Sequence, residues 1–93
     1  MTANRIGELF YTLHQGVAAT DTDLIGSRGQ QLLEQVAMTA RHAQESYELG
    51  WYERALDQME SVVHHAADWN ADTQNVLGIA RELVDLLYDL ANA

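Results

Sequence analysis

The chain contains no proline, no cysteine and no lysine. Because proline interrupts helices, its absence leaves every segment free to be helical. Without cysteine there are no disulfides and no thiolate metal ligands, which excludes a disulfide-stapled secreted module. No apolar run approaches the ~20 residues of a membrane-spanning helix, and the first residues lack the charged-then-apolar pattern of a signal peptide. We therefore expect a cytoplasmic protein that does not enter a membrane.

Acidic side chains dominate the charge of the chain. Its 93 residues include 14 acidic and 5 basic side chains, which gives a formal net charge of −9. A surface of this kind repels nucleic acids and anionic lipids and attracts basic proteins. We therefore expect a protein partner, for which basic proteins are the candidates, and no direct nucleic-acid binding. Adaptation to high salt is a second interpretation of the same composition.

Apolar residues recur at helical spacing almost from end to end. The spacing predicts one domain over residues 1–93, built from amphipathic helices. We expect four helices, at about residues 3–17, 51–67 and 71–91, with a second helix that begins between residues 20 and 30 and ends at about residue 49. Four such helices with short connections predict an all-α fold, either an antiparallel bundle or stacked helical hairpins. The positions expected in the core are Ile6, Leu9, Phe10, Leu13 and Val17; Leu32, Leu33, Val36, Ala40, Ala43 and Tyr47; Tyr52, Ala55, Leu56, Met59, Val62, Val63 and Ala66; Val76, Ile79, Ala80, Leu83, Leu86, Leu87 and Leu90.

Two starts compete for the second helix, because residues 20–23 and residues 27–30 both resemble a capping box. We favour the earlier start, since Ile25 precedes Leu32 by seven residues and is in phase with it. Gly50 is the expected end of this helix, because glycine commonly follows a helix C-terminus. For the last helix, Asn70 is the expected N-cap and Asp72 suits the positive helix end.

The last predicted helix has an unusually wide apolar stripe. Leu77, Val84 and Ala91 lie beside its main stripe and widen it to about half of the circumference. One interpretation is that this helix lies centrally in its own bundle. The other is that Leu77 and Val84 bind a second copy of the chain, which would make the protein a homodimer.

Five positions around one predicted turn form a pattern: Ala43, Gly50, Tyr52, Ala55 and Met59. Gly50 permits a tight turn, Tyr52 wedges between the two helices, and Ala55 lets their backbones approach. Over about residues 36–68 the chain thus resembles a tetratricopeptide-repeat hairpin. The resemblance implies a helical hairpin that binds peptides or partner proteins and has no catalytic activity.

Glu53, Asp57, Glu60 and His64 fall on one face of the third predicted helix. Carboxylates together with imidazole bind divalent metals, so Glu60 and His64 with His42 are candidates for a metal site. A solvated acidic face without metal is the interpretation we favour. We accordingly expect no metal and no cofactor.

The sequence contains no strand–turn–helix nucleophile elbow, no glycine-rich phosphate loop and no inward pair of carboxylates, so we expect no enzyme. Trp51 and Trp69 lie near opposite ends of the third predicted helix, where they either close the bundle or anchor a partner. These features favour a small non-catalytic interaction or adaptor module that forms a homodimer. The alternatives are an acidic inhibitor that mimics nucleic acid, of the kind phages use, and a metal-binding helical protein.

Overall fold

The prediction of an all-α fold is confirmed by the structure, a computed structural model. It describes residues 2–20, 22–64 and 73–93, and these residues contain helices and no strand. The helices are α1 (Thr2–Ala19), α2 (Thr22–Glu48), α3 (Tyr52–His64) and α4 (Gln74–Ala91). None of the helices in the described ranges is long and apolar enough to cross a membrane.

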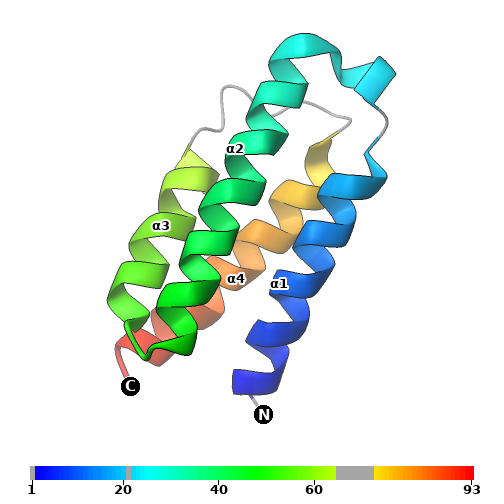
Figure 1. Cartoon of the computed structure of the whole chain (residues 1–93). Coiled ribbons are helices and arrows are strands. Elements are labelled where there is room, and N and C mark those ends of the chain that lie inside the picture. The colour runs from blue at the N-terminus through cyan, green and yellow to red at the C-terminus, as the bar shows by residue number, and fades with distance from the viewer. Residues whose placement is uncertain (1, 21, 65–72) are drawn as a thin grey trace.

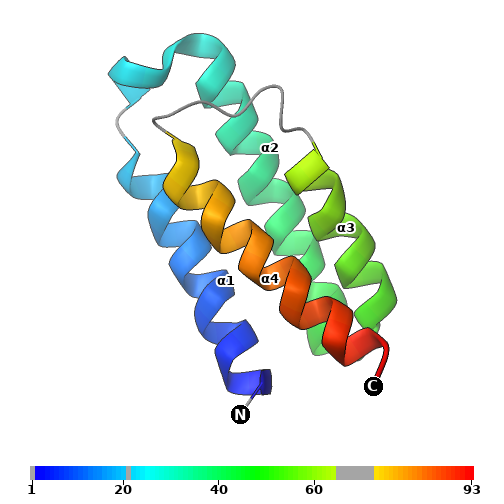
Figure 2. The same ribbon diagram turned by 180° about the vertical axis from the view of Figure 1, so that it is seen from behind.

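The helices form a closed antiparallel bundle. Each packs against two others, so that contacts run from α1 to α2, α2 to α3, α3 to α4 and back from α4 to α1. Consecutive helices run in opposite directions, and both chain ends lie at the same end of the molecule (Figures 1 and 2). Because α4 returns to contact α1, the structure favours a bundle over a row of stacked hairpins.

The core lies along the axis of this bundle and follows the predicted helical periodicity. Its fully or almost fully buried apolar residues are Ile6, Leu9, Phe10, Leu13, Leu32, Leu33, Val36, Ala40, Ala43, Ala55, Leu56, Met59, Val62, Val76, Leu77, Ala80, Leu83 and Leu87. Other predicted core residues, among them Val17, Tyr47 and Val63, are partly buried and pack against this cluster. Of the predicted core positions, Ala66 lies outside the described residues.

The predicted helix ends are correct to within a few residues where they fall on described positions. α1 extends one residue earlier and two residues later than predicted, and α2 ends just before Gly50. The predicted end of the third helix at about residue 67, the N-cap Asn70 and the first-turn Asp72 lie outside the described residues. α4 is described as a helix from Gln74 onward.

α2 is not one uninterrupted helix, because Gly26 leaves the helical backbone region with φ 70° and ψ −177°. Only glycine adopts such a positive φ without steric cost. The chain thus uses both predicted starts: helical backbone begins at Thr22, and the long straight stretch begins directly after Gly26. The structure does not describe the side chain of Ile25, the residue whose phase with Leu32 favoured the earlier start.

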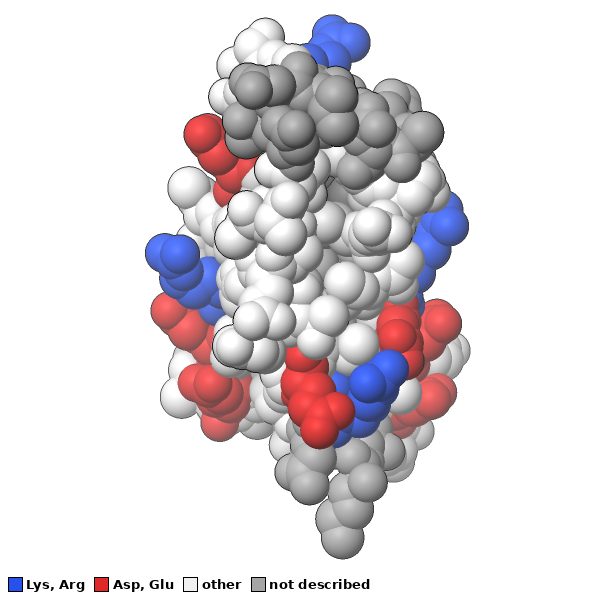
Figure 3. All heavy atoms as spheres, turned by 90° about the vertical axis from the view of Figure 1, so that its right-hand side faces the viewer, with Lys and Arg blue, Asp and Glu red and all other residues white. Residues whose placement is uncertain are grey.

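α1 and α4 are joined by close packing and by one ion pair. A Cβ atom at Gly16 would lie 3.5 Å from Cγ2 of Val76, so the side chain of Val76 packs directly beside the α1 backbone there. Arg5 donates through Nη2 to Oε1 of Glu82 at 2.8 Å, and this carboxylate raises the pKa of Arg5. The pair is exposed and contributes little to stability. In the view of Figure 3, charged side chains lie at the sides, at the lower end and at the top of the molecule.

Candidate partner-docking surface

The turn between α2 and α3 is built by backbone hydrogen bonds that glycine makes possible. Gly50 has φ 83°. Its N–H donates to the Tyr47 carbonyl at 3.0 Å, and the N–H of Trp51 donates to the Ser46 carbonyl at 2.8 Å. This pair of bonds is a Schellman motif, which satisfies the last carbonyls of α2. The turn therefore has one defined geometry, and it ends α2 where the sequence predicted.

Trp51 is held at this turn but is not covered by the bundle. Its carbonyl accepts the N–H of Ala55 at 3.0 Å and so begins α3, while 53% of its surface is exposed. The guanidinium carbon of Arg54 lies 5.6 Å from the centroid of the indole ring, a cation–π contact. Leu49, just before the glycine, is 63% exposed. We refer to Leu49, Trp51 and Arg54 as the turn surface.

A shallow depression of about 220 Å³ lies beside the indole. Its lining residues are His42, Glu45, Ser46, Leu49, Trp51, Arg54 and Gln58. Ser46 is almost fully buried, and its Oγ lies 2.9 Å from Oε1 of Gln58 and 3.1 Å from the carbonyl oxygen of His42. The hydrogen bond between Ser46 and Gln58 joins α2 to α3 at the floor of the depression. The depression therefore has a fixed polar floor and an apolar wall formed by Trp51.

Carboxylates surround the turn surface. Glu45 lines the depression, and Glu48 and Glu53 are exposed on the two sides of the turn. Glu48 Oε1 accepts a long hydrogen bond of 3.5 Å from Nε2 of Gln44. Leu49 and Trp51 therefore form an apolar pair bordered by negative charges. Such a surface matches a positively charged segment that carries a large apolar side chain.

Aromatic packing supports the turn from the bundle side. The ring of Tyr47 lies 5.9 Å from the ring of Tyr52 and 6.2 Å from the ring of Phe10, measured between centroids. Burial raises the pKa of Tyr47, with smaller contributions from Tyr52 and Glu48. The hairpin geometry expected around Gly50 is thus present. Such contacts are common to tight helical hairpins in general, so membership of the tetratricopeptide family stays a prediction.

A second and larger depression, of about 290 Å³, lies farther along α2 and α3. Its lining residues are Leu32, Gln35, Val36, Met38, Thr39, Ser61 and Val62. Among the described residues, none that lines it is charged or titratable and none is a tryptophan, so these residues do not select a ligand by charge. The turn surface combines a fixed aromatic ring with charges of both signs, and it is the better candidate for a specific contact.

Three other residues were predicted to bind a partner: Trp69, Leu77 and Val84. Trp69 lies outside the described residues. Leu77 is 3% exposed and belongs to the core of the chain itself, while Val84 is half-buried against that core. α4 packs against α1 and α3 and so has no more neighbours than the other helices, which means that it is not central in the bundle, yet these contacts bury Leu77 and partly bury Val84. The prediction that Leu77 binds a second copy does not fit this burial.

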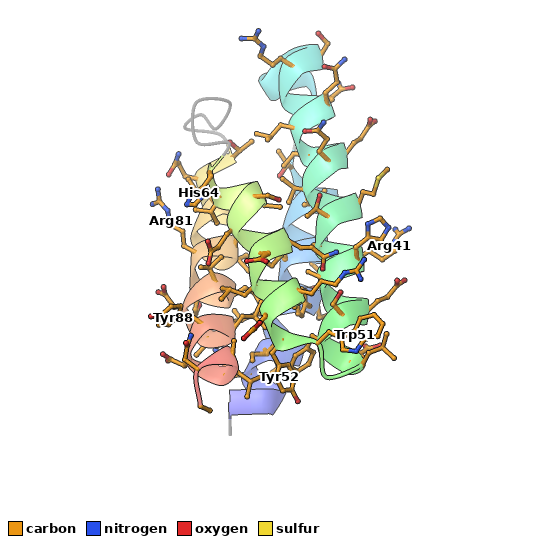
Figure 4. The ribbon with its side chains drawn as sticks, turned by 90° about the vertical axis from the view of Figure 1, so that its left-hand side faces the viewer. Arg41, Trp51, Tyr52, His64, Arg81 and Tyr88 are labelled. Atoms are coloured by element: carbon orange, nitrogen blue, oxygen red, sulfur yellow. The ribbon has the colours of Figure 1, made fainter. Side chains whose placement is uncertain are left out.

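The candidate metal ligands are not gathered into one site. His42, on α2, is exposed and lines the depression beside Trp51, near the start of α3. His64 lies at the other end of α3 (Figure 4). Glu60 is half-buried. Across the residues that the structure describes, no group of three or more histidine, aspartate or glutamate side chains is placed to hold a metal ion.

Sequence reasoning missed Leu49, Arg54 and the Ser46–Gln58 bond. A usable signal for Leu49 was its position directly before the helix-ending glycine, where no later turn of α2 can cover it. Arg54 follows Trp51 by three residues at the start of α3, a spacing that places two side chains on one face. No family model, curated protein or solved structure matches the chain. Its function is therefore argued from the geometry of this surface.

Proposed function

We propose that the protein is a small non-catalytic interaction module, and that it binds a basic segment of another protein at the turn surface. The observation that carries the proposal is the exposed indole of Trp51, whose ring contacts Arg54 and whose backbone is held by the turn. Tryptophan is the residue type most enriched among interface hot spots. Because the Schellman turn and Arg54 already restrict Trp51, binding loses little conformational entropy there.

The chemistry of the partner follows from the groups around the indole. Leu49 and Trp51 offer apolar area, and Glu45, Glu48 and Glu53 offer negative charge. The fitting segment carries one large apolar side chain flanked by lysine or arginine. The chain lacks cysteine and so needs no oxidising compartment, and we place the module in the cytoplasm.

Paired variants of two exposed aromatic residues test the proposal. Trp51→Ala is compared with Tyr88→Ala, because Tyr88 is 57% exposed and points away from the turn on the side of α4 (Figure 4). Each tagged full-length variant is used to purify partners from the native host, which are quantified by mass spectrometry. The purified partner is then titrated by calorimetry.

Trp51→Ala should weaken partner binding by about 30-fold or more, the loss expected of a hot spot. Tyr88→Ala should bind like the wild type, and both variants should keep the wild-type melting temperature. Equal binding by Trp51→Ala and the wild type would refute the turn surface as the binding site.

The net charge of −9 specifically favours a second candidate, an acidic inhibitor that occupies a nucleic-acid site on its target. Mimicry of this kind depends on carboxylates spread over the surface rather than on one indole. Its binding should therefore fall steeply with salt and remain nearly unchanged in Trp51→Ala. The same pair of variants, titrated at two salt concentrations, separates the two functions.

A further inference from the structure

The turn surface lies at one end of a longer surface between α2 and α3. The two helices run side by side, with Trp51 at their lower end in Figure 4. Residues of both helices line the depression beside the indole and also the larger, second depression. On α2, Thr39 of the second depression precedes His42 of the first by three residues. On α3, Gln58 and Ser61 are related in the same way, and residues three apart share a helix face. The two depressions are therefore neighbours in one groove.

The second depression differs from the first in its chemistry. Its almost fully buried apolar lining residues are Leu32, Val36 and Val62. The residues that line it carry no charge, whereas the first depression contains Glu45 and Arg54. A charged side chain covered there would lose its water without gaining a partner of opposite charge, so the site favours an apolar side chain. We refer to this second depression as the neutral depression.

The backbone of a bound segment must also be satisfied along the groove. α2 and α3 pair their own backbone groups as helices, and the part of the chain that the structure describes has no strand whose edge could take an extended segment. A helix pairs its own N–H and C=O groups and can lay an apolar face into a groove. The groove therefore favours a helical segment over an extended one.

Carboxylates outnumber arginines along the groove. Besides Glu48 and Glu53 of the turn, the exposed charged residues within four positions of a lining residue include Glu34, Glu45 and Asp57, and the arginines Arg28, Arg41 and Arg54. This excess of negative charge suits lysine or arginine on the sides of a bound helix.

We propose that the basic segment binds as an amphipathic helix along the α2–α3 groove and places a second large apolar side chain in the neutral depression. This inference rests on the proposed function, and it extends the partner from one apolar side chain to two on the same helix face. The first of these side chains contacts Trp51 and the second covers Leu32, Val36 and Val62.

The positions of the two depressions set the spacing of these side chains. On α2 the lining residues shift by ten positions, from Leu32 and Thr39 to His42 and Leu49, which is about 15 Å. On α3 the shift is about seven positions, or roughly 11 Å. Residues on one face of a helix are about 10.5 Å apart at a spacing of seven and about 16.5 Å apart at a spacing of eleven. A spacing of seven fits the interval more closely.

Synthetic lysine–alanine peptides of about 20 residues, long enough to form isolated helices, test this spacing. One carries a single leucine, the second carries two leucines seven residues apart on one face, and the third carries two leucines nine residues apart on opposite faces. Each is titrated into the full-length protein, and amide chemical shifts measured by NMR give the affinity. The second peptide should bind about tenfold more tightly than the first, because it buries one more leucine, and the third should bind like the first.

A matched pair of variants locates the second leucine. Ser61→Arg places a charged side chain in the neutral depression, and Thr12→Arg makes the same change on α1, which has no contact with α3 among the described residues. Both hydroxyls are exposed and donate to a carbonyl of their own helix, at 2.7 Å and 2.8 Å respectively. Ser61→Arg should lose the gain from the second leucine, and Thr12→Arg should retain it. Circular dichroism should show the wild-type fold for both.

Equal affinity of the first and second peptides for the wild type, or a gain that persists in Ser61→Arg, would overturn this inference. The proposed function would still stand in that case if the single-leucine peptide binds the wild type and loses affinity in Trp51→Ala. Absence of binding by all three peptides would refute both proposals.

Discussion

Trp51 and Tyr11 are both exposed aromatic residues, 53% and 65% respectively, yet their surroundings differ. Trp51 contacts the Arg54 guanidinium and has glutamates on both sides of its turn, whereas Tyr11 lies in a stretch of α1 without charge. Exposure alone does not distinguish the two residues. The neighbouring charges do, because they decide which kind of surface each aromatic ring can approach without electrostatic penalty.

The turn and α1 are connected through the core. Removing a core contact between them should have the largest effect on the free energy of unfolding. Phe10 is fully buried on the inner side of α1, and its ring contacts Tyr47 beneath the turn. Phe10→Ala should lower the free energy of unfolding by about 3–5 kcal/mol, from lost burial and a residual cavity. Urea unfolding followed by circular dichroism measures the change.

Phe10→Leu serves as the milder variant if Phe10→Ala fails to fold, with an expected loss of about 1 kcal/mol. Unfolding curves from tryptophan fluorescence and circular dichroism should coincide, because both regions belong to one cooperative unit. Two separate transitions would show that the turn and α1 unfold independently.

Glycine substitutions should have opposite signs in the two regions. Gly50 has φ 83°, and a Cβ atom there would strain the backbone although nothing lies within 4 Å of it. Gly50→Ala should therefore destabilise the protein by about 1–2 kcal/mol. Gly7 lies in helical backbone with equally open space, so Gly7→Ala should stabilise it by about 0.5–1 kcal/mol. Thermal unfolding of both variants measures the contrast, and a shift in the same direction would contradict it.

Salt should weaken the proposed binding of a basic partner. Binding of a basic partner at the turn surface should weaken as salt screens its attraction to Glu45, Glu48 and Glu53. We expect changes of several-fold, roughly 1 kcal/mol, between low and moderate salt. Calorimetric titrations at two salt concentrations measure the change, and an affinity that does not depend on salt would contradict the role of these three glutamates.

The smallest effect concerns alkaline pH. Burial raises the pKa of Tyr47 above its unfolded value near 10. The neutral phenol therefore contributes its full stability below about pH 10, and this contribution is lost as pH rises toward the folded pKa. Tyr47→Phe should flatten the loss of stability above pH 10, as measured by urea unfolding across that range. An alkaline slope identical to that of the wild type would contradict this assignment.

Helical periodicity predicted the fold well, because burial of one stripe per helix is a property of the sequence itself. Ile6, Phe10 and Leu13 repeat once per turn and are all fully buried. The break at Gly26 could not be located in this way. Two cap-like patterns flank it, and only the packing of the whole bundle decides where the backbone leaves the helical region.

The candidate surfaces were only partly predictable. Trp51 was identified from its residue type and position, but its contact with Arg54 depends on rotamers that the sequence does not specify. Leu77 was assigned to a partner because a wide stripe does not reveal how much of it neighbouring helices cover.

The half-exposed indole of Trp51 also gives the protein an intrinsic spectroscopic probe. An indole in contact with water emits at longer wavelength than one in an apolar environment, so a ligand that covers Trp51 should shift its emission to the blue. The chain has two tryptophans, and replacing Trp69 by phenylalanine would leave Trp51 as the single emitter. Occupancy at the turn could then be followed in solution without any attached label.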